Sequence, residues 1–210
     1  MLSKKLTAGG ERGKTYEFKE LLSSHSSLLK KRWIGSCSKH SFEEWFSQNY
    51  SMILFNKVRY LKARERKAFE ISFIKDEAGS SILMRNGKTY DTSHEKTEYH
   101  GEGFAIFVVG TDKKLHCASH TKDEFHHSSF YAGRPVLCSG EIRTNPEGKL
   151  KWVINKSGHY RPSVVENLIF LKFLEENGID LTKVKFGDYI HNSAYNASEY
   201  LLSGGTCPIE

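Results

Sequence analysis

Cysteine is scarce in this 210-residue chain, and its four cysteines stand far apart. No two of them have the short spacing of zinc-ribbon ligands, and four are too few for a dense disulfide framework. Long apolar runs are missing as well, because no stretch approaches the about 20 residues that a membrane-spanning helix requires. We therefore expect reduced thiols in a cytosolic setting and no membrane partner.

Several catalytic motifs are also absent. The sequence has no GxxxxGK[ST] or GxGxxG phosphate loop, no GxSxG nucleophile elbow and no HExxH zinc motif. Four histidines lie within a dozen positions, but the alternation of "KKLHCAS" predicts a strand, which would point His116 and Cys117 to opposite faces. We expect no metal site, and any nucleotide would have to be held without a phosphate loop.

The composition is that of a folded domain with a modest positive charge. Hydrophobic residues make up 38% and aromatic residues 12%, enough to build a packed core. The net charge of +6 and the pI of about 9.0 indicate an anionic partner. Basic residues are interleaved with acids, and the basic–aromatic pattern of an RNA platform is not evident, so nucleic acid is not expected.

The chain divides into three parts. Residues 1–20 are polar and predict a flexible leader, residues 21–57 predict a helical segment, and residues 58–210 predict the main domain. Within the helical segment, Ser41 and Glu44 match a capping box. Its stretches "SLLKKRWIG" and "EEWFSQNY" carry large aromatics typical of interface anchors, so we expect partner recognition there. The alternative is that they complete the core of the main domain.

Within the main domain, three hairpins precede a helix. "SILMRNGKTYD" has a tight-turn signal at Asn86-Gly87, and "FAIFVVGTDKKLHCAS" and "PVLCSGEIRTNPEGKLKWVIN" are the other two. Ser163 and Glu166 form a capping box before an apolar stripe, and Gly178 ends that helix. The tail from Phe186 is polar and tyrosine-rich, with one short apolar pair at Leu201-Leu202. These patterns predict an α+β fold with a mostly antiparallel sheet and flanking helices.

Two polar–aromatic loops flank the last hairpin. "EFHHSSFYAGRP" (residues 124–135) precedes it and "NKSGHYRPS" (residues 155–163) follows it, so both should meet at one end of the sheet. Each also has a structural interpretation: a turn whose serines satisfy backbone groups, and a helix entry on which Tyr160 packs. Their proximity favours a site.

These residues resemble a known family. "YLKARERKAFEISF", "GKTYDT", "FHHSSFYAGRP", "CSGEI" and "NKSGHYRPSVVENLIFLKFLEENGIDLTKVK" resemble the conserved domain of plant IQ-motif-containing, calmodulin-associated proteins. They equally resemble small bacterial effectors with a PARP-like ADP-ribosyltransferase fold, of the CteC kind, which modify ubiquitin on a threonine. The first 57 residues contain no IQ motif and the chain is compact, which favours the effector branch; calmodulin is then not expected as a partner.

The effector resemblance implies a site that uses NAD as its substrate. Cleaving the nicotinamide bond leaves a ribosyl cation, which a carboxylate must stabilise. Glu141 is the first choice for that carboxylate, Asp123 is its acidic partner with Asp91 as the alternative, and His127 acts beside them. The expected cofactor contacts are Ser128, Ser129, Phe130, His159, Tyr160 and Arg161.

The resemblance thus implies a mono-ADP-ribosyltransferase, a glycosyltransferase that modifies ubiquitin or another host protein and blocks ubiquitination. As a virulence factor it would be a secreted bacterial effector acting in the host cytoplasm. Two alternatives stay open. Cys117 or Ala118 stands where the family's first-strand Arg or His anchor is expected, which favours a non-enzymatic interaction module with a degenerate PARP-like fold. The other alternative is an NAD glycohydrolase.

Overall fold

The computed structural model describes residues 6–7, 15–16, 39, 41, 58–77, 79–158 and 160–206. The chain forms two compact units, Met1–Arg59 and Tyr60–Glu210. In the first unit, β1 (Leu6–Thr7) pairs antiparallel with β2 (Thr15–Tyr16). Most of the predicted leader, most of the helical segment and Glu44 of its capping box lie outside the described residues. The division into leader, helical segment and main domain stays a prediction.

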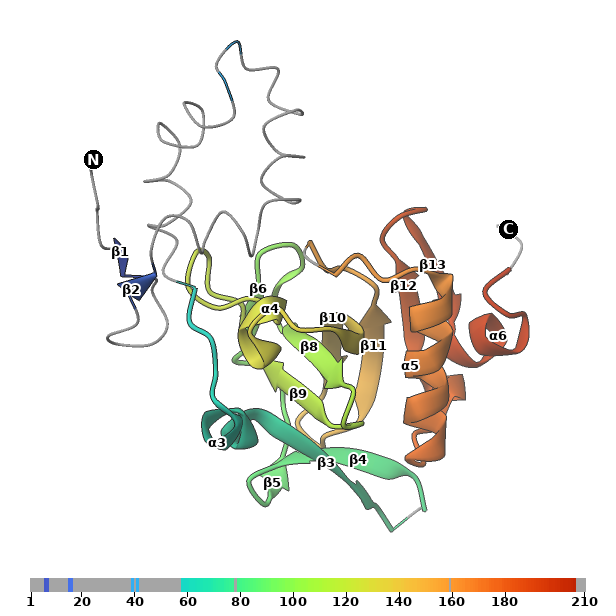
Figure 1. Ribbon diagram of the computed structural model, residues 1–210. Helices are drawn as coiled ribbons and strands as arrows, with labels where there is room; N and C mark the ends of the chain where they lie inside the picture. The colour runs from blue at the N-terminus through green and yellow to red at the C-terminus, as the bar shows by residue number, and fades with distance from the viewer. Residues whose placement is uncertain are drawn as a thin grey trace. The chain divides into compact units, whose positions relative to one another are not determined.

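A nine-stranded sheet organises the second unit (Figure 1), in the order β13-β12-β11-β10-β8-β9-β3-β4-β5. Neighbouring strands are antiparallel throughout, except β11 and β12, which are parallel. The predicted α+β class with a mostly antiparallel sheet is confirmed. The strands are β3 (Glu70–Lys75), β4 (Ser81–Arg85), β5 (Lys88–Thr89), β8 (Ala105–Gly110), β9 (Leu115–Ala118), β10 (Val136–Thr144), β11 (Leu150–Ile154), β12 (Lys185–Asp188) and β13 (Ser193–Asn196).

The three predicted hairpins are present. In the first, Asn86 and Gly87 have φ of 52° and 77°, the left-handed pair that a two-residue hairpin turn requires. The second joins β8 to β9 and the third joins β10 to β11. Alternation along β9 puts Cys117 into one core cluster, while His116 packs against the Tyr131 ring on the other face, as predicted.

The predicted helix is α5 (Val164–Glu176), and its ends follow the expected signals. The Ser163 hydroxyl accepts a hydrogen bond from the Val165 N–H at 3.3 Å, and Glu166 accepts one from the Ser163 N–H at 2.8 Å. Gly178 lies beyond the end with φ of 82°. Because β11 and β12 are parallel, the chain must cross over between them, and α5 makes that crossover beside the sheet (Figure 1).

The sheet separates two hydrophobic clusters. On one face, β8 and β10 pack against α5 and α6 (Ala197–Leu202), where Phe107 stacks on Phe170 with ring centroids 4.1 Å apart. On the other face, Ile106 and Val108 pack against α4 (His127–Tyr131), whose Phe130 is fully buried. Alternation along β8 produces this division, because successive side chains point to opposite faces.

Two stretches hold regular structure that the sequence patterns did not predict. The stretch 124–135 is not only a turn, because residues His127–Tyr131 form one helical turn, with all five residues buried. Its end at Ala132 and Gly133 has φ of 52° and 74°, so the turn begins there. The tail from Phe186 holds β12, β13 and α6, and the Asn196 side chain caps α6 by accepting from the Ser198 N–H at 2.9 Å. Short polar elements of this kind carry too little hydrophobic periodicity to be recognised.

Over the part of the chain that the structure describes, no helix has the length and apolar character needed to cross a membrane. Within the same residues, no group of three or more His, Cys, Asp or Glu side chains is placed to hold a metal ion. The remaining elements are short: α3 (Ala63–Arg66), the 3-10 helices η1 (Lys67–Phe69) and η2 (Leu181–Lys183), and the ladder of β6 (Lys96–Thr97) with β7 (Gly101–Glu102).

Candidate functional site

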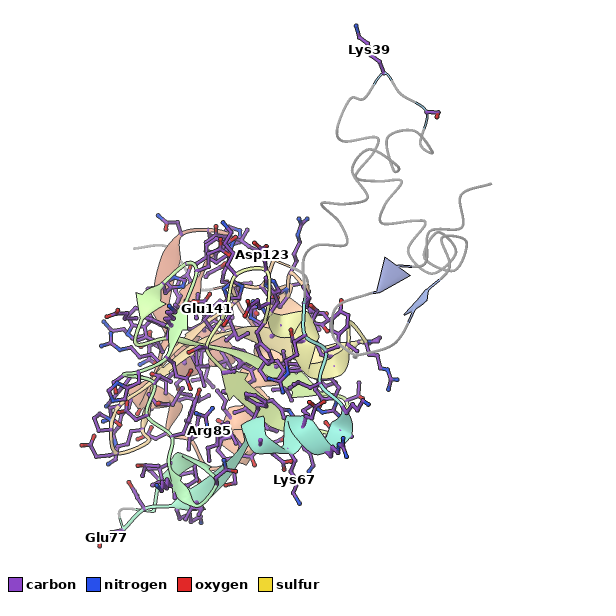
Figure 2. All side chains as sticks on the ribbon, turned by 90° about the vertical axis from the view of Figure 1, so that its left-hand side faces the viewer. Lys39, Lys67, Glu77, Arg85, Asp123 and Glu141 are labelled. Carbon is purple, nitrogen blue, oxygen red and sulfur yellow. The ribbon has the colours of Figure 1, made fainter. Side chains whose placement is uncertain are left out.

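Glu141 is a buried acid in the middle of β10. Its residue is 1% exposed, between Ile106 of β8 and Ile154 of β11. One carboxylate oxygen, Oε2, accepts a hydrogen bond from Thr97 Oγ1 at 2.8 Å and lies 2.6 Å from His100 Nδ1. Figure 2 places Glu141 and Asp123 towards one end of the second unit and Glu77 towards the other. Because Thr97 belongs to β6 and His100 lies between β6 and β7, the β6–β7 ladder covers the face of the sheet on which the Glu141 side chain lies.

Burial raises the pKa of Glu141 above its ordinary value of 4.5, because removing the carboxylate from water disfavours its charged form. The hydrogen bonds from Thr97 and His100 oppose this effect, and so does the positive charge of Lys156. A second contact holds the His100 ring, which lies 5.2 Å from the Phe104 ring. The carboxylate is thus enclosed by groups of this chain.

An exposed aromatic cluster stands near this carboxylate. The Lys156 ammonium lies 3.8 Å from the ring centroid of Tyr99 and 3.4 Å from that of Tyr189, and the two rings contact each other edge to face. Tyr99 is 55% exposed and Tyr189 is 46% exposed, so both rings face solvent. Lys156 and Tyr189 follow β11 and β12, and the carboxyl ends of parallel strands meet at one edge of a sheet, where ligands commonly bind.

The residues of α4 predicted to contact a cofactor are held in structural contacts. The His127 Nε2 lies 2.8 Å from the Gly140 carbonyl oxygen, and the Ser129 hydroxyl accepts from the His126 N–H at 2.9 Å. Phe130 packs edge to face on Phe125, and Ser128 is buried. These contacts match the structural interpretation of the loop; a role of these side chains toward a cofactor stays a prediction.

The two polar–aromatic loops do meet, as expected. Tyr160 of the second loop donates its hydroxyl hydrogen bond to the Arg134 carbonyl of the first at 3.0 Å. Arg161 is exposed and adopts a left-handed φ of 46°, with its N–H donating to the Ser157 carbonyl. His159 lies outside the described residues. The two loops therefore lie side by side, joined by the hydrogen bond of the Tyr160 side chain.

The predicted acidic pair does not share an environment. Asp123 is exposed and has φ of 61° in the turn closed by the Thr121–Phe125 bridge, whereas Glu141 is buried. Asp91, the alternative partner, accepts hydrogen bonds from the Ser93 N–H and hydroxyl, which lower its pKa. The structure thus gives Glu141 hydroxyl and imidazole partners.

Sequence reasoning missed the groups that surround Glu141. Thr97 and His100 stand 44 and 41 positions before it, and Lys156 stands between two tyrosines that come from different loops. No spacing rule connects residues so far apart, and only a contact between the β6–β7 ladder and β10 brings them together. The sequence indicated only Glu141 itself, as an acid on a predicted strand with apolar neighbours.

Replacing Glu141 with glutamine is expected to change how stability depends on pH. Because the folded-state pKa of Glu141 is raised, its contribution to stability is full below the unfolded pKa and is lost as pH rises through the folded pKa. Glutamine cannot ionise, so the free energy of unfolding of the Glu141→Gln variant, relative to the wild type, should increase as the pH rises above 4.5, the ordinary pKa of this carboxyl. Urea unfolding at several pH values measures this difference.

The exposed Glu77→Gln variant corrects that comparison for the loss of one charge. A difference between the Glu141→Gln variant and the wild type that stays constant across this pH range would show that the buried carboxylate ionises without cost.

Comparison with known proteins adds an independent finding. Residues 65–167 match the family described as the IQ motif-containing protein middle domain. The chain is 36% identical over 145 residues to the IQ domain-containing protein IQM3 of Arabidopsis thaliana, covering 68% of this chain and 29% of that protein. It is 37% identical over 128 residues to IQM2 of the same plant, covering 61% and 20%. The chain spans less than a third of these relatives' length, and no solved structure matches it.

These findings correct the expected activity. Of the two resemblances, the one to plant IQ-motif proteins is confirmed and the one to CteC-like effectors is not supported. The expected mono-ADP-ribosyltransferase is wrong, because the chain matches the middle domain of IQ motif-containing proteins and relatives named for their IQ domains. The NAD glycohydrolase alternative rested on the same effector resemblance.

The expected setting and partners are also corrected. A secreted bacterial effector with a virulence role is wrong, because the relatives are plant proteins. The choice of ubiquitin as acceptor and the exclusion of calmodulin are wrong as well, because the chain matches IQ motif-containing proteins and not the effectors on which both predictions rested.

Proposed function

Residues 65–167 carry the middle domain of IQ motif-containing proteins, and from this premise we propose that the chain is a non-enzymatic interaction module that associates with calmodulin. The observation that carries this proposal is the match to that domain, together with identities above 30% to relatives named for their IQ domains. The first 57 residues contain no IQ motif, so the calmodulin contact has to come from another sequence pattern.

The stretch "SSLLKKRWIG" supplies such a pattern. Lys30, Lys31 and Arg32 form a basic run directly after Leu28-Leu29 and directly before Trp33-Ile34. Calmodulin binds basic amphipathic helices by taking large apolar anchors into its groove, while acidic residues around the groove attract the basic ones. The run therefore supports a calmodulin contact within residues 21–57, where we expect partner recognition.

The enclosure of Glu141 supports the non-enzymatic part of the proposal. A carboxylate that stabilises a ribosyl cation must reach the substrate, whereas Glu141 Oε2 already accepts from Thr97 and contacts His100. The residue is 1% exposed, which leaves its carboxylate a structural partner of the β6–β7 ladder. An exposed cluster of Tyr99, Lys156 and Tyr189 remains beside it for contact with another molecule.

Reversing the charge of the basic run is expected to weaken calmodulin binding by at least about 100-fold. The triple variant Lys30→Glu, Lys31→Glu, Arg32→Glu places three acids against an acidic partner, and like charges across an interface cost several kcal/mol. Isothermal titration of the full chain with calmodulin measures the affinity, once with Ca²⁺ and once with a chelator.

The matched control carries the same charge change elsewhere, at Lys4→Glu, Lys5→Glu and Lys14→Glu. It should bind calmodulin within about threefold of the wild type, because it leaves the apolar anchors and their basic flank intact. Equal losses in both triple variants would assign the effect to bulk charge, and no binding by the wild type in either condition would remove calmodulin as a partner.

Two finer points stay proposals. We keep the PARP-like architecture for the sheet, which the quoted sequence motifs support. We also keep NAD as a ligand held without turnover near Glu141, Tyr160 and Arg161, which is supported by the aromatic rings and the lysine at this end of the sheet.

A further inference from the structure

A surface pocket of about 400 Å³ lies at Arg143, the second residue after Glu141 along β10. Its walls include Arg143 of β10, Trp152 and Lys151 of β11, and the Asp91–Ser93 loop. Volumes of about 300–1,000 Å³ are typical of small-molecule sites. Of the site residues predicted from the sequence, the pocket includes Asp91, the alternative acidic partner.

Strand register explains why these side chains gather there. Arg143 stands directly opposite Trp152, and Trp152 stands directly opposite Lys185 of β12. Residues that oppose each other on neighbouring strands point to the same face, so the three form a row of cation, indole and cation. The register shifts between Arg143 and Thr144, which leaves Lys151 as the extra residue of a bulge and turns it into the same pocket.

Two buried threonines, Thr144 in the pocket wall and Thr92 beside it, hold the surrounding backbone in place. Thr92 Oγ1 donates to the Gly103 carbonyl at 2.8 Å and accepts from the Thr144 N–H at 2.9 Å. Thr144 Oγ1 donates to the Tyr90 carbonyl at 2.6 Å. These bonds tie the Asp91–Ser93 loop to the bulge before any ligand arrives. A pocket that is already formed loses little conformational entropy on binding.

Within the residues that the structure describes, the cations in and beside the pocket have no acidic partner. Among the described residues, the side chains of Arg143, Lys151 and Lys185 have no ion pair, and their ring contacts are Arg143 over Phe104 at 5.8 Å and Lys185 over Trp152 at 5.3 Å. Some cations elsewhere in this unit do have acidic partners, as in Arg85–Glu95, Lys114–Glu70 and Lys149–Asp76.

One acid, Asp91, lies in the same pocket, and hydrogen bonds within its own loop hold its carboxylate. Both Asp91 carboxylate oxygens accept from Ser93, at 2.9 Å from the N–H and 2.6 Å from the hydroxyl. Arg143 and Lys151 line the pocket together with this single acid, so the net charge of the lining is positive. An anionic ligand is the charge complement of such a pocket.

We propose that this pocket binds a small organic phosphate, with Arg143 and Lys151 as ligands of the phosphate group and Trp152 beside the organic part. A guanidinium matches the oxygens of a phosphate in a paired geometry, and the dianion suits two cations. The indole wall and the volume provide room for more than the phosphate alone. This site is independent of the proposed calmodulin contact.

Adenosine monophosphate is the probe, with adenosine and inorganic phosphate as its two halves. In titrations of the full chain followed by NMR, adenosine monophosphate should bind saturably and shift the Trp152 indole N–H, and each half should bind more weakly. Arg143→Gln should weaken the binding of adenosine monophosphate by about tenfold or more, the usual cost of losing a charge-assisted hydrogen bond. Arg143 is exposed, so this variant should keep the wild-type unfolding midpoint.

The matched control is Arg64→Gln, an exposed arginine on α3, which should bind like the wild type. The proposal is overturned if adenosine monophosphate shows no saturable binding up to about 10 mM, or if Arg143→Gln binds as well as Arg64→Gln. Binding of vesicles containing an anionic phospholipid, without binding of adenosine monophosphate, would overturn the small-molecule ligand and assign the pocket to a lipid headgroup.

Discussion

Replacing Gly140 with alanine is expected to destabilise the protein by about 3 kcal/mol. A Cβ at this position would lie 2.2 Å from the Ile154 carbonyl oxygen and 2.8 Å from Cε1 of Phe107. The carbonyl belongs to β11, so relief of the clash requires moving one strand of the β10–β11 pair. The Gly140 carbonyl also contacts His127 of α4 at 2.8 Å, so the same movement disturbs the packing of that helix on the sheet.

Gly158→Ala is the matched control, because a Cβ there has no atom within 4 Å and the residue has no left-handed φ. We expect its free energy of unfolding to stay within about 0.5 kcal/mol of the wild type. Urea denaturation of the full chain, followed by circular dichroism, measures both variants. Similar stabilities of the Gly140→Ala and Gly158→Ala variants would show that the β10–β11 pair adapts without loss.

Truncating Phe170 to alanine is expected to cost about 4 kcal/mol, the middle of the range for large aromatic side chains in cores. Phe170 is 2% exposed and stacks on Phe107 of β8 at a ring centroid distance of 4.1 Å, and its ring is also stacked with that of Phe173 at 6.2 Å. The side chain therefore connects α5 to the central strand, and its loss leaves a cavity between helix and sheet that neither element can close.

The exposed Val165 of the same helix provides the control, since it is 62% exposed and Val165→Ala removes little buried surface. Its free energy of unfolding should change by less than about 0.5 kcal/mol. Differential scanning calorimetry of the full chain gives the midpoint and enthalpy for both variants. A loss below about 1 kcal/mol at Phe170 would contradict the packing of α5 described above.

Local signals in the sequence predicted much of the fold. Asn86-Gly87 identified its hairpin because two left-handed residues in succession suit a tight turn, and Ser163 with Glu166 identified the start of α5 because each satisfies the other's backbone N–H. Neither inference needed a long-range contact. The segment from Phe186 was missed for the converse reason: β12 and β13 are strands because the sheet edge pairs with them, and their own composition gives no pattern.

The candidate site was predictable only in part. Glu141 stood out as an acid on a strand, and the meeting of the loops around residues 134 and 160 followed from the hairpin between them. The partners of Glu141 could not be predicted, because Thr97 and His100 reach it across more than 40 positions. The stretch "EFHHSSFYAGRP" was interpreted as a polar–aromatic loop beside a site, whereas the residues of α4 within it are buried against the sheet.

The sequence by itself determined the elements whose cause is local, namely the hairpins, the capped helix and the mostly antiparallel class, and its similarity to the IQ motif-containing middle domain. Only the tertiary structure decided what Glu141 contacts and where Arg143, Trp152 and Lys185 line up. The reason is physical: caps and turns are satisfied by neighbours in the chain, whereas burial, charge pairing and pocket shape depend on which strands pair and in which register.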